Sequence, residues 1–318
     1  MEKVCVVLVT YNRKQMLLNL LEALAGSTYP IDSIIIVDNK STDATSDFLM
    51  ERGLIFEAKE GEITQREWKN ININYYLNTF NAGGSGGFAK AFSLVREMDF
   101  DVVWAMDDDV QPEEDCLSEM MKYLDDDCWM AIPNRGDKNF TDYAIQHYNL
   151  TNPFFFHVNE CKRDMINGET LKVPYVSVED MAFEGPLMRM ELIRKIGIPD
   201  KNYFIIFDDT DYAHRALAYT KIRYIRDAHL HKQIVPKPGQ KWTWKSFYSI
   251  RNSVYFDRKY GENAFVRHLR PFFRIFDLTL RAVVKGNLYR VKWIIRAYFE
   301  GKTGCMGKTV DASEIPVR

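Results

Sequence analysis

Four short apolar runs, separated by segments with helical periodicity, constrain the fold of this chain more than any other feature. The runs are brief and nearly continuous, which is typical of strands buried on both faces of a parallel sheet. They are Val4–Val9, Ser33–Val37, Asn72–Leu77 and Val102–Met106. Helices are expected between and after them, at Lys14–Ala25, from the cap Ser41-Thr42-Asp43 through Met50, at Phe88–Met98 and from Pro112 onward. This alternating order predicts an α/β domain with a mostly parallel, Rossmann-like sheet and helices on its faces.

Polar residues follow each of the four expected strands. The segments are Thr10-Tyr11-Asn12-Arg13, Asp38-Asn39, Asn81 to Gly87, and Asp107-Asp108-Asp109. In open α/β sheets, ligands bind beyond the carboxyl ends of the strands. The sequence therefore predicts that these segments converge on one polar crevice.

The acidic triplet Asp107-Asp108-Asp109 is the strongest local signal for chemistry. Residues two apart on an extended backbone point the same way, so Asp107 and Asp109 can share one side and hold a divalent cation. Three adjacent carboxylates repel one another, and a cation or hydrogen-bond donors must offset that repulsion. The alternative is a solvated acidic loop that caps the next helix, because acidic residues favour helix N-termini.

The glycine-rich segment Asn81–Phe88 also allows more than one interpretation. Glycines let the backbone approach a ligand closely, and the N–H groups of the following helix can face a diphosphate. Gly84-x-Gly86-x-x-Ala89, with Asp107 about 20 residues further on, fits the loose dinucleotide fingerprint, so a nicotinamide-dependent oxidoreductase is the main rival. Against this rival, the glycines follow the third expected strand rather than the first. A flexible loop without a ligand is the structural alternative.

A second acidic cluster, Asp208-Asp209-Thr210-Asp211, follows the apolar run Tyr203–Ile206 and precedes a helix-like stretch. Sugar transfer with inversion needs a base that deprotonates the acceptor hydroxyl. A metal ion offsets negative charge on the leaving diphosphate. One acidic cluster for the metal and one for the base fit this division, whereas the plain alternative for Asp208 or Asp209 is a helix cap.

Two histidines, His229 and His231, follow the strand-like run Ile222–Ile225. Either imidazole could complete an oxygen-rich Mn²⁺ site with Asp107 and Asp109. Only one of the two is expected to be a ligand, and the residues alone do not decide which.

Composition excludes several classes of protein. The chain has 42 Lys and Arg against 44 Asp and Glu, which argues against a nucleic-acid binder. Its five cysteines are scattered without a CxxC pair, so a reducing, cytoplasmic compartment is expected rather than a zinc module or a disulfide framework. The apolar run after Met1-Glu2-Lys3 is too short for a signal peptide, and no apolar stretch has the length of a membrane-spanning helix.

The last third of the chain, residues 236–308, is expected to be helical and is strongly basic, and residues 309–318 look like a tail. Between Lys237 and Lys308 there are 16 Lys or Arg and four acids. Basic residues alternate with apolar ones here: Arg267, Arg270, Arg274, Arg281, Lys285, Arg290, Lys292 and Arg296 with Phe272, Phe273, Leu278, Val283, Trp293 and Ile294. Basic amphipathic helices can lie on an anionic membrane. The alternative is a helical subdomain that packs on the catalytic domain or forms a dimer.

With these residues in view, the sequence resembles the family-2 glycosyltransferases over residues 3–235. The resemblance is carried, in chain order, by Val9-Thr10-Tyr11-Asn12-Arg13, Val37-Asp38-Asn39, Asn81-x-Gly83-Gly84-x-Gly86-Gly87-Phe88, Trp104-x-Met106-Asp107-Asp108-Asp109 and Phe207-Asp208-Asp209-x-Asp211-Tyr212-x-x-Arg215. It is strongest to the branch of bacterial galactofuranosyltransferases and rhamnosyltransferases. It implies a GT-A fold, in which residues 1–130 bind the nucleotide sugar and residues 131–235 form the acceptor and base half of the same domain.

The resemblance also implies roles for individual residues. Donor-binding positions would be Thr10, Asn12, Arg13, Asp38, Asn81, Gly83, Gly84, Gly86, Gly87, Asp107 and Asp108. Within this set, Thr10, Arg13 and Asp38 would border the uridine or thymidine, and Asn81 and the glycines would lie along the sugar diphosphate. Mn²⁺ or Mg²⁺ would be held by Asp107, Asp109 and His231. Asp209 would be the base, with Asp208 beside it, and Glu184, Gly185 and Asp208 would contact the acceptor.

The chain departs from polymerising galactofuranosyltransferases at Phe183-Glu184-Gly185-Pro186, where a tryptophan-rich stretch is expected, and in lacking their N-terminal β domain. Addition of one or a few sugars is therefore favoured. The predicted enzyme is inverting and metal-dependent. It uses UDP-galactofuranose, or dTDP-rhamnose as second choice, with a glycan or polyprenyl-diphosphate-linked acceptor in bacterial surface polysaccharide synthesis, such as O-antigen or capsule. It is expected in the cytoplasm or on the inner face of the plasma membrane, and a homo-oligomer is one option for its assembly. A noncatalytic sugar-nucleotide binder is the remaining alternative.

Overall fold

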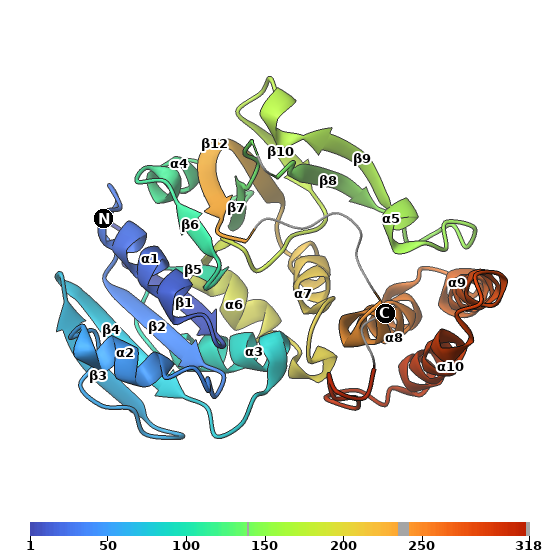
Figure 1. Cartoon of the computed structure of the whole chain (residues 1–318). Helices are drawn as coiled ribbons and strands as arrows, with labels where there is room; N and C mark the ends of the chain where they lie inside the picture. The colour runs from blue at the N-terminus through green and yellow to red at the C-terminus, as the bar shows by residue number, and fades with distance from the viewer. Residues whose placement is uncertain (139, 235–241, 316–318) are drawn as a thin grey trace.

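The computed structural model describes residues 1–138, 140–234 and 242–315 (Figure 1). Its strands are β1 (Val4–Thr10), β2 (Ser33–Asp38), β3 (Ile63–Trp68), β4 (Ile71–Leu77), β5 (Val102–Asp107), β6 (Val110–Pro112), β7 (Met130–Asn134), β8 (Tyr143–Tyr148), β9 (Lys162–Asn167), β10 (Tyr175–Val178), β11 (Leu187–Arg189) and β12 (Ile222–Lys232). Its helices are α1 (Lys14–Ala25), α2 (Thr45–Glu51), α3 (Gly83–Val95), α4 (Cys116–Met121), α5 (Val158–Cys161), α6 (Met190–Ile196), α7 (Asp208–Ala216), α8 (Trp244–Tyr260), α9 (Ala264–Val284) and α10 (Leu288–Thr303), with 3-10 turns at Gly168–Thr170 and Lys201–Tyr203.

A mixed sheet organises the first three quarters of the chain. In the described residues it has ten strands in the order β10-β12-β7-β11-β5-β1-β2-β4-β3, with β6 paired to β12. The central strands β5, β1, β2 and β4 are parallel, as the sequence predicts. β11 lies antiparallel between β5 and β7, so the second half of the sheet is mixed. β8 and β9 form a separate two-stranded sheet.

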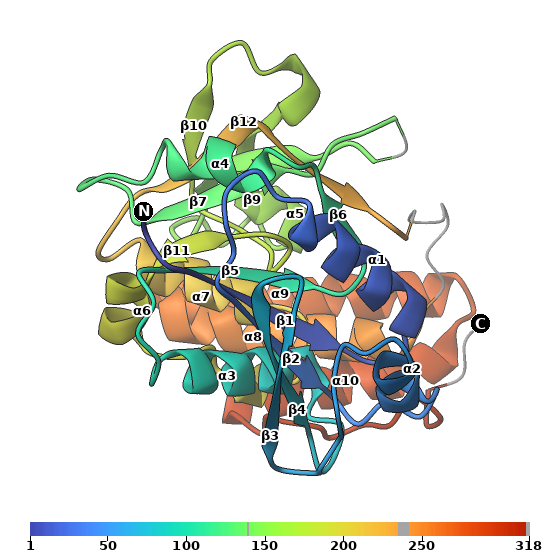
Figure 2. The same ribbon diagram turned by 90° about the vertical axis from the view of Figure 1, so that its left-hand side faces the viewer.

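Both faces of the central strands are buried. Along β1, Val4, Val6 and Leu8 join one apolar core with α1, α2 and α4. The alternate residues, such as Val7, join a second core with α3, α6 and α7. Continuous apolar runs form these strands because each has a helical layer on either side (Figure 1 and Figure 2).

Several elements differ from the sequence expectations. α3 begins at Gly83 rather than Phe88, so the glycines form its first turns. The β3 strand was not expected because its exposure alternates and it lies at the sheet edge, joined to β4 by Lys69 and Asn70 at positive φ. Pro112 lies in β6, and the next helix begins at Cys116.

The three C-terminal helices are present as predicted and lie to one side of the sheet (Figure 1). They enclose an apolar core of their own, which includes Phe247, Val254, Trp293 and Ile294. α8 also contacts the sheet domain through Arg251 and Asn252. The predicted division between residues 235 and 236 lies outside the described residues. Among the described residues, no helix has the length and apolarity needed to cross a membrane.

Candidate active site

The polar segments at the carboxyl edge of the sheet meet around one cavity of about 480 Å³, hereafter the first cavity. Its polar and glycine lining residues include Thr10, Arg13, Asn39, Asn81, Gly83, Gly84, Asp107, Asp108, Asp109, Glu184, Asp208 and Asp209. Lys245 and Trp244 of α8 also reach it. The structure therefore brings together most of the residues that the sequence singled out.

Because β5 ends at Asp107 and strand alternation does not continue past it, Asp108 lies on the same side as Asp109 and anchors the end of β1. Its buried carboxylate accepts hydrogen bonds from the Thr10 hydroxyl at 2.7 Å and the Arg13 guanidinium at 2.8 Å. The same Arg13 nitrogen lies 2.9 Å from the Asp109 carboxylate. Burial raises the pKa of Asp108, while Arg13 and Thr10 act in the opposite direction. Asp108 thus holds Arg13 at the wall of the first cavity.

Asp107 has the chemistry of a cation ligand. Its carboxylate forms no ion pair among the described residues, and burial followed by the nearby charges of Asp109 and Glu184 raises its pKa well above the usual value. A divalent cation would relieve this repulsion, and carboxylate oxygens are the ligands that Mg²⁺ and Mn²⁺ prefer. Asp107 and Asp109 therefore fit such an ion, with further ligands left to diphosphate oxygens and water.

His231 does not join this pair, because the strand expected to end at Ile225 continues to Lys232 and its side chains alternate. Lys232 reaches the Glu184 carboxylate at 2.8 Å, on the side of the first cavity. His231 lies on the other side, 2.8 Å from Glu113. The described residues hold no cluster of three or more His, Cys, Asp or Glu suited to a metal, so the expected ligand set is not assembled here.

His229 is held by a backbone hydrogen bond: its carbonyl accepts the N–H of Glu113 at 3.0 Å. Neither histidine lines the first cavity. Lys232 was missed by the sequence analysis, although a period of two counted forward from Leu230 would have indicated it.

Two predicted donor contacts, Asp38 and Asn12, are not among the residues that line the first cavity. The buried Asp38 carboxylate accepts hydrogen bonds from the Ser41 N–H and the Tyr75 hydroxyl, both at 2.7 Å. The Asn12 side chain accepts the Thr42 N–H at 2.6 Å. Both residues thereby shape the loop after β2.

The four predicted glycines divide into two pairs. Gly83 and Gly84 line the first cavity at the start of α3. A Cβ on Gly86 or Gly87 would instead lie 2.5 Å from Ala82 or Val9, inside the protein. Gly86 and Gly87 therefore permit close packing of α3, and only the first pair can touch a ligand.

A strained loop presents Asp208 and Asp209. Phe204, Ile206 and Phe207 all have φ between 66° and 76°, a region that side chains with a Cβ rarely adopt. The apolar run that begins at Tyr203 is therefore the end of a 3-10 turn followed by this loop. Strain of this kind persists only where the surrounding structure holds it in place.

Asn252 of α8 supplies that restraint. Its buried amide donates to the carbonyls of Tyr203, Ile205 and Ile206 at 3.1, 2.8 and 2.7 Å. Arg251 adds a 2.9 Å bond to the first of these carbonyls. No local pattern in the sequence indicates this contact, because Asn252 lies about fifty residues after the carbonyls that it contacts.

Replacing Asn252 with alanine is expected to destabilise the protein by about 3 kcal/mol, because buried carbonyls lose their donor. Catalytic turnover should fall more than donor affinity, since the loop carrying Asp209 loses its restraint. Urea unfolding and steady-state kinetics measure the two effects. Asn287→Ala is the matched control, because Asn287 precedes α10 without a side-chain cap bond. Equal stability of the two variants would contradict the role of Asn252.

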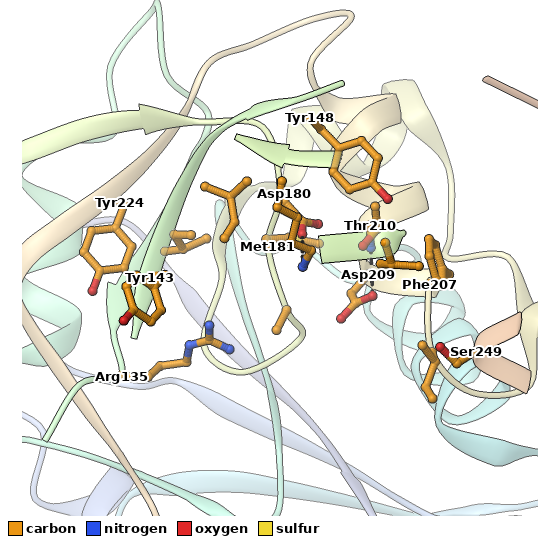
Figure 3. Close-up of a pocket in the computed structure, with 16 residues that line it drawn as sticks. Arg135, Tyr143, Tyr148, Asp180, Met181, Phe207, Asp209, Thr210, Tyr224 and Ser249 are labelled. Atoms are coloured by element: carbon orange, nitrogen blue, oxygen red, sulfur yellow. Dashed lines mark hydrogen bonds and ion pairs between the residues drawn. The ribbon is translucent and has the colours of Figure 1, made fainter. Parts of the chain in front are cut away.

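A second cavity of about 280 Å³ adjoins the first (Figure 3). The two share Ala182, Ile206 and Asp209. Arg135 and Asp209 point into the second cavity from opposite sides (Figure 3). Its remaining polar walls include Tyr143, Tyr148, Thr210, Tyr224, Ser249 and the ion pair of Lys162 with Asp180 at 2.7 Å.

Asp209 lies where the two cavities meet, and its pKa is strongly perturbed. Burial, and then the charges of Asp208 and Asp180, raise its pKa to about 8. Burial raises the pKa of Asp208 to about 6. A carboxylate with a raised pKa is a stronger base, as proton abstraction requires.

The two predicted acceptor contacts near residue 184 behave differently. Glu184 lines the first cavity and is paired with Arg135 at 2.7 Å and with Lys232. Gly185 lines neither cavity, and its carbonyl accepts the Trp104 indole N–H at 2.8 Å. A Cβ on Gly185 would lie 2.7 Å from Pro133, so this glycine serves packing.

Comparison with known proteins identifies the family. The model of the family described as glycosyl transferase family 2 matches residues 5–197. The chain belongs to glycosyl transferase family 2. Galactofuranosyltransferase GlfT1 of Mycolicibacterium smegmatis is 23% identical to this family-2 protein over 232 residues, which cover 68% of the chain and 65% of the relative. The match thus spans slightly less than two thirds of that relative.

Solved structures confirm the fold. Mannosyltransferase PcManGT from Pyrobaculum calidifontis, in complex with GDP-Man and Mn²⁺, superposes with a TM-score of 0.57 at 14% identity, over 94% of this chain and 87% of that one. S. aureus TarS 1-349 gives 0.54 at 14% identity, over 94% and 80%. The predicted GT-A fold with a C-terminal helical region is therefore confirmed for this family-2 glycosyl transferase, and the nicotinamide alternative has no support.

Proposed function

We propose that this protein transfers a sugar from a nucleotide diphosphate in the first cavity to an acceptor hydroxyl in the second. The observation that carries the proposal is the place of Asp209, which lines both cavities. A base at their junction can take the proton of a hydroxyl in the second cavity while that hydroxyl faces the sugar carbon in the first.

The first cavity suits a sugar diphosphate with a divalent cation. Arg13 is held at its wall by Asp108, and the N-terminus of α3 opens on it at Gly83 and Gly84. Asp107 and Asp109 would hold Mn²⁺ or Mg²⁺. Such an ion supplies positive charge that stabilises the departing diphosphate.

The second cavity suits the acceptor. Asp209 takes the proton of an acceptor hydroxyl while that oxygen forms a bond to the anomeric carbon of the donor sugar. The bond from this carbon to the diphosphate oxygen breaks on the opposite face, and the diphosphate leaves with the electron pair. Configuration at the carbon is thereby inverted. Asp208, at the wall of the first cavity beside Asp209, is placed for contact with sugar hydroxyls.

The finer identity of the substrates is also a proposal. UDP-galactofuranose is the first choice of donor, supported by the relative named galactofuranosyltransferase GlfT1, and dTDP-rhamnose is the second. The acceptor would be a glycan or a polyprenyl-diphosphate-linked sugar of a bacterial surface polysaccharide. We further propose a peripheral position on the inner face of the plasma membrane and the two-part division of the GT-A domain near residue 130.

The test is calorimetric binding and turnover of a panel of nucleotide sugars with Mn²⁺, Mg²⁺ or EDTA. One UDP- or dTDP-sugar is expected to bind with metal, and Asp109→Asn should weaken that binding by at least tenfold. Asp47→Asn, an exposed acid on α2, is the matched control. Failure of every nucleotide sugar to bind with either metal would refute the proposal. Binding without turnover, when candidate acceptors are supplied, would indicate the noncatalytic binder.

A further inference from the structure

Helix α9 buries two arginines and exposes a row of large apolar side chains. Arg270 and Arg274 are 0% and 3% exposed, and both pair with the buried Asp257 at 2.6 and 2.8 Å. On the outer side, Phe272 and Phe276 are 52% and 60% exposed. The sequence analysis counted both arginines in the polar face of an amphipathic helix, and the structure corrects that assignment.

The outer residues form a continuous stripe that we call the α9 stripe. Its members follow helical spacing and are Phe265, Leu269, Phe272, Phe276, Leu280 and Val283, all classed among the exposed large apolar residues. A helix of 21 residues is about 30 Å long, so the stripe runs along most of that length. Exposed Leu288, Ile295 and Phe299 on the neighbouring α10 add to it. Large exposed apolar patches mark sites of interaction.

Charge decides between possible occupants of the stripe. The exposed charged residues of α9, α10 and their connection are basic: Arg267, Arg281, Lys285, Lys292 and Lys302. The two acids between residues 264 and 303, Asp277 and Glu300, are each paired with an arginine and mostly covered. A second copy packed stripe to stripe would bring like charges together without acids to offset them. An anionic surface would complement the basic residues.

We propose that the α9 stripe and the exposed apolar residues of α10 lie on an anionic phospholipid bilayer. The phenylalanine and leucine side chains enter the boundary between headgroups and acyl chains, and the surrounding lysines and arginines contact the phosphates. Long basic side chains can extend from an apolar surface to the headgroups.

The second cavity lies close to this surface. Tyr148 and Val158 line the cavity, and the loop between them is bonded to α9, because Arg270 donates to the Asn149 carbonyl at 2.7 Å. At the tip of the loop, the exposed Phe154 stacks on Phe273 of α9 with ring centroids 6.1 Å apart. Bilayer contact would therefore place a lipid-borne acceptor near the loop that joins two lining residues of the second cavity, a step that rests on the proposed function.

Flotation of the whole chain with vesicles tests the surface without any nucleotide sugar. We expect binding to vesicles containing phosphatidylglycerol, and at least tenfold weaker binding to pure phosphatidylcholine. The double variant Phe272→Ser with Phe276→Ser should lose at least tenfold in binding. Phe56→Ser, at a still more exposed phenylalanine of the sheet domain, should bind as the wild type does. Circular dichroism and donor affinity of the double variant should be unchanged.

A second variant, which changes charge, tests the same surface even if the double phenylalanine variant fails to fold. Lys285→Glu with Lys292→Glu should reduce binding to the anionic vesicles at least tenfold. No binding of the wild type at low salt would overturn the proposal, as would full binding of either double variant. A dimer that the phenylalanine variant dissociates, without vesicle binding, would show that a second copy covers the stripe. Because donor binding is measured separately, failure here leaves the proposed chemistry untouched.

Discussion

An Asp209→Asn variant is expected to transfer sugar about 10³-fold more slowly than the wild type, with nearly unchanged donor affinity. The amide keeps the shape of the side chain and the hydrogen bond from the Thr210 N–H, which is 2.8 Å long. It cannot accept the proton of the acceptor hydroxyl. Turnover at saturating donor and acceptor measures the first effect, and calorimetry measures the second.

Asp164→Asn is the matched control for Asp209→Asn. Asp164 is an exposed acid with φ of 49°, a conformation that asparagine tolerates. This variant should keep wild-type turnover. Replacing a general base is expected to leave far less than about a third of the wild-type turnover. If Asp209→Asn retained more than that fraction, Asp209 would not be the base.

The pH profile provides a second check on the same residue. Burial and the nearby Asp208 and Asp180 carboxylates raise the pKa of Asp209 to about 8. Only the deprotonated carboxylate can take a proton, so the rate should rise with pH up to about this value and then level off. A bound cation or donor would shift this pKa, and kcat/KM is therefore the quantity to follow, since it reports the free enzyme.

The parts of the site that the sequence could predict are those with local signals. The acidic triplet follows a buried strand, and the parallel sheet brings its carboxyl edge next to Thr10 and Arg13. Each of these inferences needs only a strand, its period and its neighbours.

The parts that could not be predicted depend on distant partners. The irregularity of β12 between Ile225 and His229 hid the length of that strand, and so hid which side His231 faces. The inward position of Arg270 depends on Asp257, which lies on another helix. Helical periodicity assigns a charged residue to the polar face of a helix. It does not predict whether a buried residue of opposite charge on another helix pairs with that residue. The same limit applied to Asn252, whose partners are three backbone carbonyls.

Replacing Gly83 with alanine is expected to destabilise the protein by about 2 to 5 kcal/mol, whereas Gly84→Ala should change stability by less than about 1 kcal/mol. Gly83 has φ of 74°, and a Cβ there would lie 2.1 Å from the Phe204 carbonyl oxygen. A Cβ on Gly84 would meet no atom within 4 Å. Urea unfolding without donor compares the two variants directly.

Function should respond to Gly83→Ala as well, because the carbonyl that the new methyl group displaces belongs to the strained loop. Phe204 itself has φ of 66°, and its carbonyl accepts the Ser85 N–H at 3.2 Å, which joins this loop to the first turn of α3. A shift there would move the N-terminus of α3 and Asp209 relative to each other. Both donor affinity and turnover should therefore fall in Gly83→Ala. Equal destabilisation by Gly84→Ala would instead show that the first turn of α3 tolerates no side chain at either position, independently of Phe204.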